Sequence, residues 1–392
     1  MKNRTFSLLT LFVMALFMSS CFQDKEQVDI YHYTDEELNI LSKSLDLPEI
    51  RDEYTIKFPK HMRDRGLRPP SINDAKATVG RVLFYDKKLS KNNSISCASC
   101  HNQALAFADD KALSDGYEGL KTKRNSLALA SVVNFPTYYG GSNSFISGSI
   151  VRPRFFWDER AGTVAEQSTM TIQDNIEMGM NLDDLARKVQ DVDYYQVLFK
   201  KAYGDVPITK EIVLDAVQEF VNSFVSADSK FDHEMDIYGN PEVDFGGFSD
   251  LENMGKRLFL ENCSSCHSAD MSTPVETTAN NGLDEEYSDI GLEGFTGNPL
   301  DRAKFKVPPL RNIEFSAPYM HDGRFATLEE VVEHYNSGIK NNAHLDSRLR
   351  DSNSNPKRLG LTETEKSALV AYMKTFTDNN FLSDKKFSDP FK

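Results

Sequence analysis

The sequence predicts a mainly helical fold with long loops and little β structure, divided into two domains. Segments in which apolar and polar residues alternate strictly are scarce, and this argues against extended strands. A Gly-basic-x-Leu-Phe pattern occurs at 80–84 and again at 255–259, each time shortly before a Cys-x-x-Cys-His motif. With 392 residues, the chain is long enough for two domains that each bury a core.

The N-terminus has the features of an export signal. Lys2 and Arg4 precede a short apolar run, and small residues precede Cys21, so residues 1–20 are predicted to be a signal peptide. The sequence FMSSC at 17–21 resembles a bacterial lipobox, in which cleavage leaves Cys21 as a lipid-modified first residue. We therefore expect a protein of the periplasm or cell envelope that is anchored to the membrane through a lipid on Cys21. An ordinary signal peptide or an N-terminal anchor is the alternative.

The domains are delimited by composition. Residues 21–70 are expected to form a tether and an N-terminal extension, which ends at a Pro-Pro pair. The Gly-, Pro- and Asp-containing segment 239–250 predicts the boundary between a domain at 71–238 and a domain at 239–392. The acidic segment 274–300 is expected to be a surface loop.

A helix is predicted before each Cys-x-x-Cys-His motif. The first begins at Ser71 with Asp74 in the capping-box position, and the second begins at Ser249 with Glu252 in the same relation. Helical spacing gives each an apolar face, formed by Ala75, Val79, Val82 and Leu83 in the first and by Leu251, Met254 and Leu258 in the second.

Two more helices are predicted in the C-terminal domain from the same capping signal. One begins at Thr327 with Glu330, and the other begins at Thr362 with Glu365. The last helix is expected to bury a ridge formed by Leu369, Tyr372, Met373 and Phe376.

All four cysteines other than Cys21 lie in the two motifs, so none remains for a disulfide. Cys-x-x-Cys-His is the attachment signature of c-type haem, in which the thiols form thioethers and the histidine ligates iron. A zinc site built from both motifs, or a pair of redox dithiols, is the alternative. We predict two covalent haems c in two cytochrome c-type domains, attached to Cys97, Cys100, Cys263 and Cys266 and ligated by His101 and His267.

The net charge and the positions of the histidines limit the classes of function that the chain can have. The formal net charge of −14 argues against binding to nucleic acid. No histidine occurs between residues 102 and 232, so the first domain offers its haem only Met170, Met178, Met180, a tyrosine or no protein group as a second ligand. A haem with an open position would make an enzyme, whereas two haems with both positions filled would make an electron carrier.

Several motifs occur in one order along the chain: SISCASCH at 94–101, KRNS at 123–126, FFWDERA at 155–161, AEQ at 165–167, IEMGM at 176–180 and the segment 307–335. In these motifs and their order, the chain resembles the bacterial di-haem cytochrome c peroxidases, including their MauG-like branch. The resemblance runs from about residue 71 to residue 378. It implies that the first domain is peroxidatic and reduces hydrogen peroxide to water. It also implies that the second domain transfers electrons from a small donor protein of the cytochrome c or cupredoxin type.

The resemblance assigns roles to three residues. It implies that Gln167 and Glu177 line the distal pocket of the first haem, with Glu177 as acid/base, and that Trp157 relays electrons between the haems. Without it, Glu177 would be interpreted as a surface carboxylate and Trp157 as a core aromatic. The family usually has glycine where this chain has Glu159, so the local turn is expected to differ.

The resemblance also implies a calcium ion between the haems, bound by Asn125 and by backbone oxygens near Ser316 and Pro318. Many of these peroxidases block the distal side with a histidine at the position of Tyr117. Because this chain lacks that histidine, the resemblance implies that the distal side of the first haem is open without prior reduction, unless Tyr117 itself ligates the iron.

Met320 and Tyr335 are the candidate ligands on the far side of the second iron. Met320 is the default in small cytochromes c. Tyr335 shares a helix face with Leu328, Val331 and Val332, and the MauG-like branch has tyrosine at this position. We predict Tyr335, with a buried core tyrosine as the alternative.

These observations favour a peroxidase. A MauG-like oxidase that modifies a partner protein and a plain di-haem electron carrier are the alternatives, and a homodimer is left open.

Overall fold

The computed structural model describes residues 32–49, 52–131, 137–138, 150–151, 154–271, 275 and 277–392. The expected signal peptide and Cys21 therefore lie outside the described residues. Among the residues that are described, no helix is both long and apolar enough to cross a membrane.

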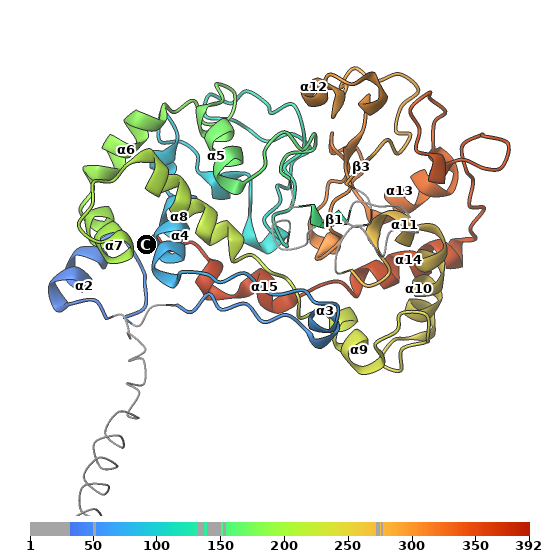
Figure 1. The fold of residues 1–392 in the computed structure, drawn as a ribbon, viewed down its shortest axis with the longest axis horizontal. Helices are drawn as coiled ribbons and strands as arrows, with labels where there is room; N and C mark the ends of the chain where they lie inside the picture. The colour runs from blue at the N-terminus through green and yellow to red at the C-terminus, as the bar shows by residue number, and fades with distance from the viewer. Residues whose placement is uncertain are drawn as a thin grey trace, which may run out of the picture.

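Helices dominate the described part of the chain, and this confirms the predicted mainly helical class (Figure 1). Two short antiparallel pairs are formed by β1 (Thr137–Tyr138) with β2 (Ile150–Val151) and by β3 (Thr278–Ala279) with β4 (Phe305–Lys306). The helices of the N-terminal half are α2 (Asp35–Leu41), α3 (Lys60–Asp64), α4 (Asp74–Tyr85), α5 (Val164–Gln173), α6 (Leu182–Gln190), α7 (Asp193–Tyr203) and α8 (Lys210–Asn222). Those of the C-terminal half are α9 (Lys230–Tyr238), α10 (Asp250–Asn262), α11 (Ser264–His267), α12 (Glu293–Thr296), α13 (Leu328–Glu333), α14 (Glu363–Lys374) and α15 (Asn379–Ser383), and a π-helical turn, His334–Gly338, continues α13.

The first core is organised by the crossing of α4 and α8. The two backbones approach closely at Gly80, where a Cβ atom would lie 2.0 Å from the carbonyl oxygen of Ala216. One turn further along α4, Phe84 packs against Phe220 and Phe224, with ring centroids 5.5 and 5.8 Å apart. Helix α8 was not predicted from the sequence.

The second core repeats this arrangement with α10 and α14. A Cβ atom at Gly255 would lie 1.8 Å from the carbonyl oxygen of Ala368. Phe259 packs against Tyr372 and Phe376 at 5.3 and 6.0 Å, close to the spacings in the first core. The repeated glycine and phenylalanine therefore mark two equivalent helix crossings, one in each half of the molecule in Figure 1.

The predicted ridge of α14 is confirmed, because its four residues are all buried. The predicted face of α10 is partly wrong: Leu258 packs against the second core, but Leu251 is 38% exposed, and the residues that the helix buries include Gly255 and Phe259. The close approach at Gly255 sets which face of α10 turns inward, and apolar spacing alone does not reveal it.

The capping boxes at Ser249, Thr327 and Thr362 form as predicted. The predicted N-cap at Ser71 is wrong, because Asn73 caps α4 by accepting a hydrogen bond from the backbone nitrogen of Lys76 at 3.1 Å. The Asp74 carboxylate instead accepts from the backbone nitrogen of Tyr54 at 2.9 Å, which ties the N-terminal extension to α4.

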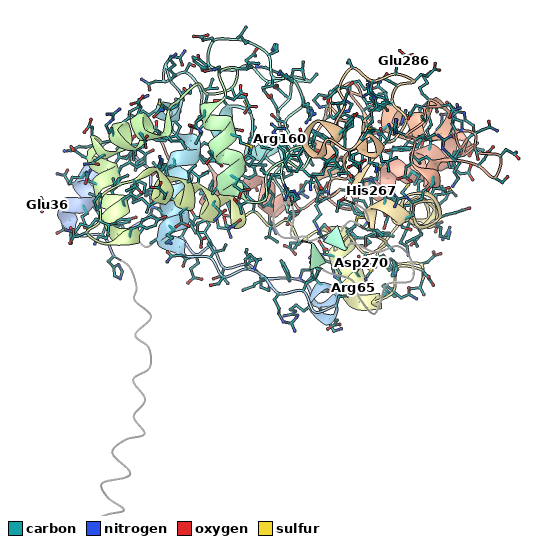
Figure 2. All side chains as sticks on the ribbon, turned by 45° about the horizontal axis from the view of Figure 1, so that its top comes forward. Glu36, Arg65, Arg160, His267, Asp270 and Glu286 are labelled. Atoms are coloured by element: carbon teal, nitrogen blue, oxygen red, sulfur yellow. The ribbon has the colours of Figure 1, made fainter. Side chains whose placement is uncertain are left out.

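Each end of the chain contacts the domain formed mainly by the other end. Phe381 and Phe387, from the C-terminal tail, are buried in the first core. The extension reaches the second domain, where Arg65 pairs with the buried Asp270 at 2.5 Å (Figure 2). Helix α9 precedes the expected boundary at 239 but packs in the second core, so that boundary does not coincide with the division between the cores.

We expect Gly255→Ala to destabilise the protein. Alanine normally favours a helix by about 1 kcal/mol over glycine, but here the methyl group would collide with the Ala368 carbonyl. Overpacking of this kind costs about 1–3 kcal/mol. Denaturant unfolding measures the change, and Gly294→Ala in α12, where the nearest atom would be at 3.6 Å, is the control. If the two variants were equally stable, the close approach of the helices at Gly255 would not be a packing constraint.

Candidate functional site

The first Cys-x-x-Cys-His motif presents its groups to a cavity in the N-terminal domain. Cys97, Cys100 and His101 all line this cavity, and the two thiols form no disulfide. The Nδ1 atom of His101 donates a hydrogen bond to the carbonyl oxygen of Phe107 at 2.7 Å. Burial lowers the pKa of His101, which keeps the ring neutral. Its Nε2 atom is therefore the nitrogen that remains for a metal.

The second motif has the same geometry. Cys263 follows α10 directly, and His267 ends α11, so the helix crossing fixes the position of the motif. The Nδ1 atom of His267 donates to the carbonyl oxygen of Pro308 at 3.2 Å, and burial lowers the pKa of this ring to about 4. These residues line a second cavity, and Cys266 also lines it without a disulfide. Each cavity thus has the two thiols and the neutral imidazole that a covalent haem c requires.

Gln167 and Glu177 line the cavity that also contains the first motif. The side-chain nitrogen of Gln167 donates to the hydroxyl of Thr171 at 2.9 Å, one turn further along α5. Burial raises the pKa of Glu177, while a hydrogen bond with Thr171 opposes this shift. The three side chains form a polar group in the wall of this cavity, which is also lined by charged residues such as Asp158 and Arg160. Thr171 was missed, although its spacing of four residues from Gln167 places both on one helix face.

Tyr117 is not in a position to act as a ligand of the first haem. Its ring packs on Gly179, where a Cβ atom would lie 2.4 Å from it, and Tyr117 does not line the first cavity. Of the three methionines considered for that haem, only Met178 lines the cavity in the described structure, and Met170 is 41% exposed. His101 is the only histidine among the described residues that line it.

Trp157 lines both cavities. Its side chain is 9% exposed, and its Nε1 atom donates to the carbonyl oxygen of Asn125 at 2.9 Å. Glu159, where a different local turn was expected, has φ = 53°. This left-handed conformation is the one that glycine adopts most easily.

The second cavity contains both candidate ligands for its haem, Met320 and Tyr335. Between them lies Asn281, whose side-chain nitrogen donates to the sulfur of Met320 at 3.3 Å and to the hydroxyl of Tyr335 at 3.4 Å. Burial raises the pKa of Tyr335 to about 12, and the hydrogen bond from Asn281 opposes the shift. Asn281 was missed because the acidic segment 274–300 was expected to be a surface loop, whereas part of it lines this cavity.

The comparisons with known proteins agree with this geometry. A family model described as di-haem cytochrome c peroxidase matches residues 74–237, and a cytochrome c model matches residues 253–377. The cytochrome c551 peroxidase of Nitrosomonas europaea is 32% identical over 262 residues, which cover 66% of this chain and 71% of that protein. The chain belongs to the di-haem cytochrome c peroxidase family.

Other members of the family carry the MauG name. The methylamine utilization protein MauG of Methylorubrum extorquens is 28% identical over 340 residues, which cover 80% of this chain and 84% of that protein. A crystal structure of a MauG-like protein associated with microbial copper homeostasis is 30% identical, with a TM-score of 0.69, and covers 86% of this chain and 99% of that one. Peroxidases and MauG proteins are therefore both relatives of this chain.

The calcium site expected near Asn125 stays a prediction. Asn125, Ser316 and Pro318 line the second cavity together. The side-chain nitrogen of Asn125 donates to the carbonyl oxygens of Lys111 and Ala112 at 3.1 and 3.2 Å. In the described part of the chain, no group of three or more His, Cys, Asp and Glu side chains is placed to hold a metal ion. The expected site would instead be built largely from carbonyl oxygens.

We expect the double variant Cys97→Ser/Cys100→Ser to retain one covalent haem and the natural protein to carry two. The thiols of each motif line a separate cavity, so loss of one pair leaves the other intact. Intact-protein mass spectrometry counts the attached haems. The variant Ser264→Ala/Ser265→Ala, which changes only the spacer of the second motif, should keep both. A natural protein without covalent haem would contradict the assignment.

Proposed function

We propose that this protein is an exported di-haem peroxidase that reduces hydrogen peroxide to water. The observation that supports the proposal most strongly is the polar group of Gln167, Thr171 and Glu177 in the cavity that also contains Cys97, Cys100 and His101. A haem c bound at this motif supplies an iron that binds and activates peroxide. Both iron positions must be filled by protein groups in a plain electron carrier, and the described first cavity offers no second histidine.

In this proposal, Glu177 moves the proton. Cleavage of the peroxide O–O bond requires that a proton leave one oxygen and reach the other. The carboxylate of Glu177 takes up and returns this proton, and its raised pKa moves the group toward the pH range in which an acid/base catalyst is efficient. The hydrogen bond between Gln167 and Thr171 holds these two side chains in place in the wall of the cavity, where the peroxide would bind.

The electrons are proposed to come from a small donor protein of the cytochrome c or cupredoxin type. The second domain accepts them, and Trp157, which lines both cavities, carries them to the first domain. The protein would act in the periplasm or cell envelope, held by a lipid on Cys21, and would bind calcium near Asn125 between the two cavities.

We expect Glu177→Gln to lower the turnover of peroxide by about 10²–10⁴-fold, the usual contribution of a positioned acid/base. The amide retains the shape of the side chain but does not shuttle the proton, so haem content should not change. Steady-state peroxide consumption with a reduced cytochrome c measures the effect. Glu118→Gln, an exposed carboxylate outside the cavity lining, is the matched control. Full activity of Glu177→Gln would move the acid/base role to another group.

A MauG-like oxidase is the second candidate function, and Tyr335 in the second cavity favours it. A phenolate ligand is an anionic, hard donor that stabilises ferric and higher oxidation states, so the two haems could share oxidising equivalents. Such an enzyme would oxidise a partner protein rather than consume a small reductant. Slow turnover with reduced cytochromes, together with peroxide-dependent oxidation of a partner protein, would favour this function over the peroxidase.

We expect Tyr335→Phe to change the absorption spectrum and spin state of the second haem, and Met320→Leu to leave them unchanged. The reason is the predicted ligation by the Tyr335 phenolate, which raises the electron density on iron and lowers its reduction potential. Absorption and electron paramagnetic resonance spectra of the oxidised protein measure both properties. If Met320→Leu alone perturbs the second haem, methionine is the ligand and the conventional peroxidase gains support.

A further inference from the structure

A single lysine of the second domain holds the loop that carries Trp157. Lys306 lies in β4, and its backbone nitrogen donates to the carbonyl oxygen of Trp157 at 2.7 Å. Its side-chain nitrogen donates to the carbonyl oxygen of Arg154 at 2.9 Å and lies 3.3 Å from Oε1 of Glu159. All three contacts join β4 to the 154–159 loop of the first domain, so Lys306 fixes this loop at both ends.

The ion pair between Glu159 and Lys306 is buried, with 9% and 5% of the two side chains exposed. A buried ion pair seldom stabilises a protein more than a well-packed apolar pair does, because both charges lose their hydration. Glu159 also has φ = 53°, which is unfavourable for a residue other than glycine. The arrangement thus combines two unfavourable features at one residue, and this points to a role other than stability.

Trp157 is held on its other side as well. The neighbouring Asp158 pairs with Arg124 at 2.7 Å, and Arg124 forms two hydrogen bonds with Asp289 of the second domain, at 2.7 and 2.8 Å. The indole nitrogen is fixed separately by the carbonyl oxygen of Asn125. The Asp158 network retains more solvent contact, since 30% of the Asp289 side chain is exposed. The Glu159–Lys306 pair is therefore the buried part of the support for Trp157.

We propose that Glu159 and Lys306 are positioning residues, whose buried ion pair holds Trp157 between the two haem cavities and thereby sets the rate of electron transfer between the two domains. The inference rests on the proposed relay role of Trp157. Electron transfer slows steeply as the relay moves away from either partner, so small displacements of the 154–159 loop matter. Trp157 also packs against Ala303 and Phe305 of the second domain, but such apolar contacts lack the directional requirements of the polar contacts.

The test compares Glu159→Gly, Lys306→Met and the double variant in the holoprotein. Each single variant leaves one buried charge without its partner and should lower thermal stability. The double variant removes both charges and should recover much of that stability, yet it should transfer electrons between the haems measurably more slowly than the natural protein, because the loop that carries Trp157 loses its side-chain contacts with β4. Lys304→Met, which removes a partly exposed ion pair with Asp301 at 3.1 Å, is the matched control and should keep the natural rate.

Two measurements separate a positioning role from a structural one. Rapid reduction of the second haem, followed by absorption at both haems, gives the transfer rate. Ultraviolet resonance Raman spectra report the hydrogen bond of the indole, because Trp157 is the only tryptophan in the chain. In the double variant, we expect a weakened indole hydrogen bond together with the slower transfer.

The outcomes that overturn the proposal are distinct from those that overturn the relay. Suppose that the double variant transfers electrons at the natural rate with an unchanged Raman spectrum, whereas Trp157→Phe transfers them more slowly. The ion pair would then have no positioning role, and the relay role of Trp157 would stand. Natural transfer in Trp157→Phe would overturn the relay itself, and the positioning inference with it.

Discussion

The close approach of two helix backbones at a glycine is the constraint on which both domains depend. At Gly80 and Gly255, the absence of a side chain lets the helix before each motif lie directly on a carbonyl of its partner helix. The following phenylalanine then fills the space between the two helices. In the second domain, α10 continues directly into Cys263, so this packing also fixes where the thiols and His267 lie. The position of the second motif is thus a consequence of how closely two backbones meet.

The interface between the domains depends on residues that the repeat does not contain. The cores exchange chain ends, because the C-terminal tail packs in the first core and the N-terminal extension reaches the second. Between the two cavities, Trp157 is supported by polar contacts from β4 and from Asn125. Polar contacts have directional requirements that apolar packing lacks, and they define a relative position of the domains that the two cores alone would leave adjustable.

The sequence predicted features that depend on neighbours along the chain. Capping boxes at Ser249, Thr327 and Thr362 are local patterns, and so is the ridge of α14; all of them form. Tyr335 was expected to point into its domain from helix periodicity, and it lines the cavity. Features that depend on distant residues could not be predicted from the sequence. Helix α8 was missed because its N-cap, Thr209, makes no capping hydrogen bond and lacks the capping-box pattern. Asn281 and Lys306 acquire their roles only from residues that lie far away in the sequence.

The two cavities are alike where the sequence repeats and different where it does not. Each has two thiols, a histidine whose Nδ1 is tied to a backbone carbonyl, and a helix crossing behind them. The remaining walls come from unrelated segments: α5 and its following loop bring Gln167, Thr171 and Glu177 to the first cavity, whereas the 278–340 region brings Asn281, Met320 and Tyr335 to the second. The first set contains a carboxyl group, whereas the second contains a thioether and a phenol. Two similar scaffolds that present the same thiols and histidine therefore have differently lined cavities, because the remaining walls come from segments outside the repeated part.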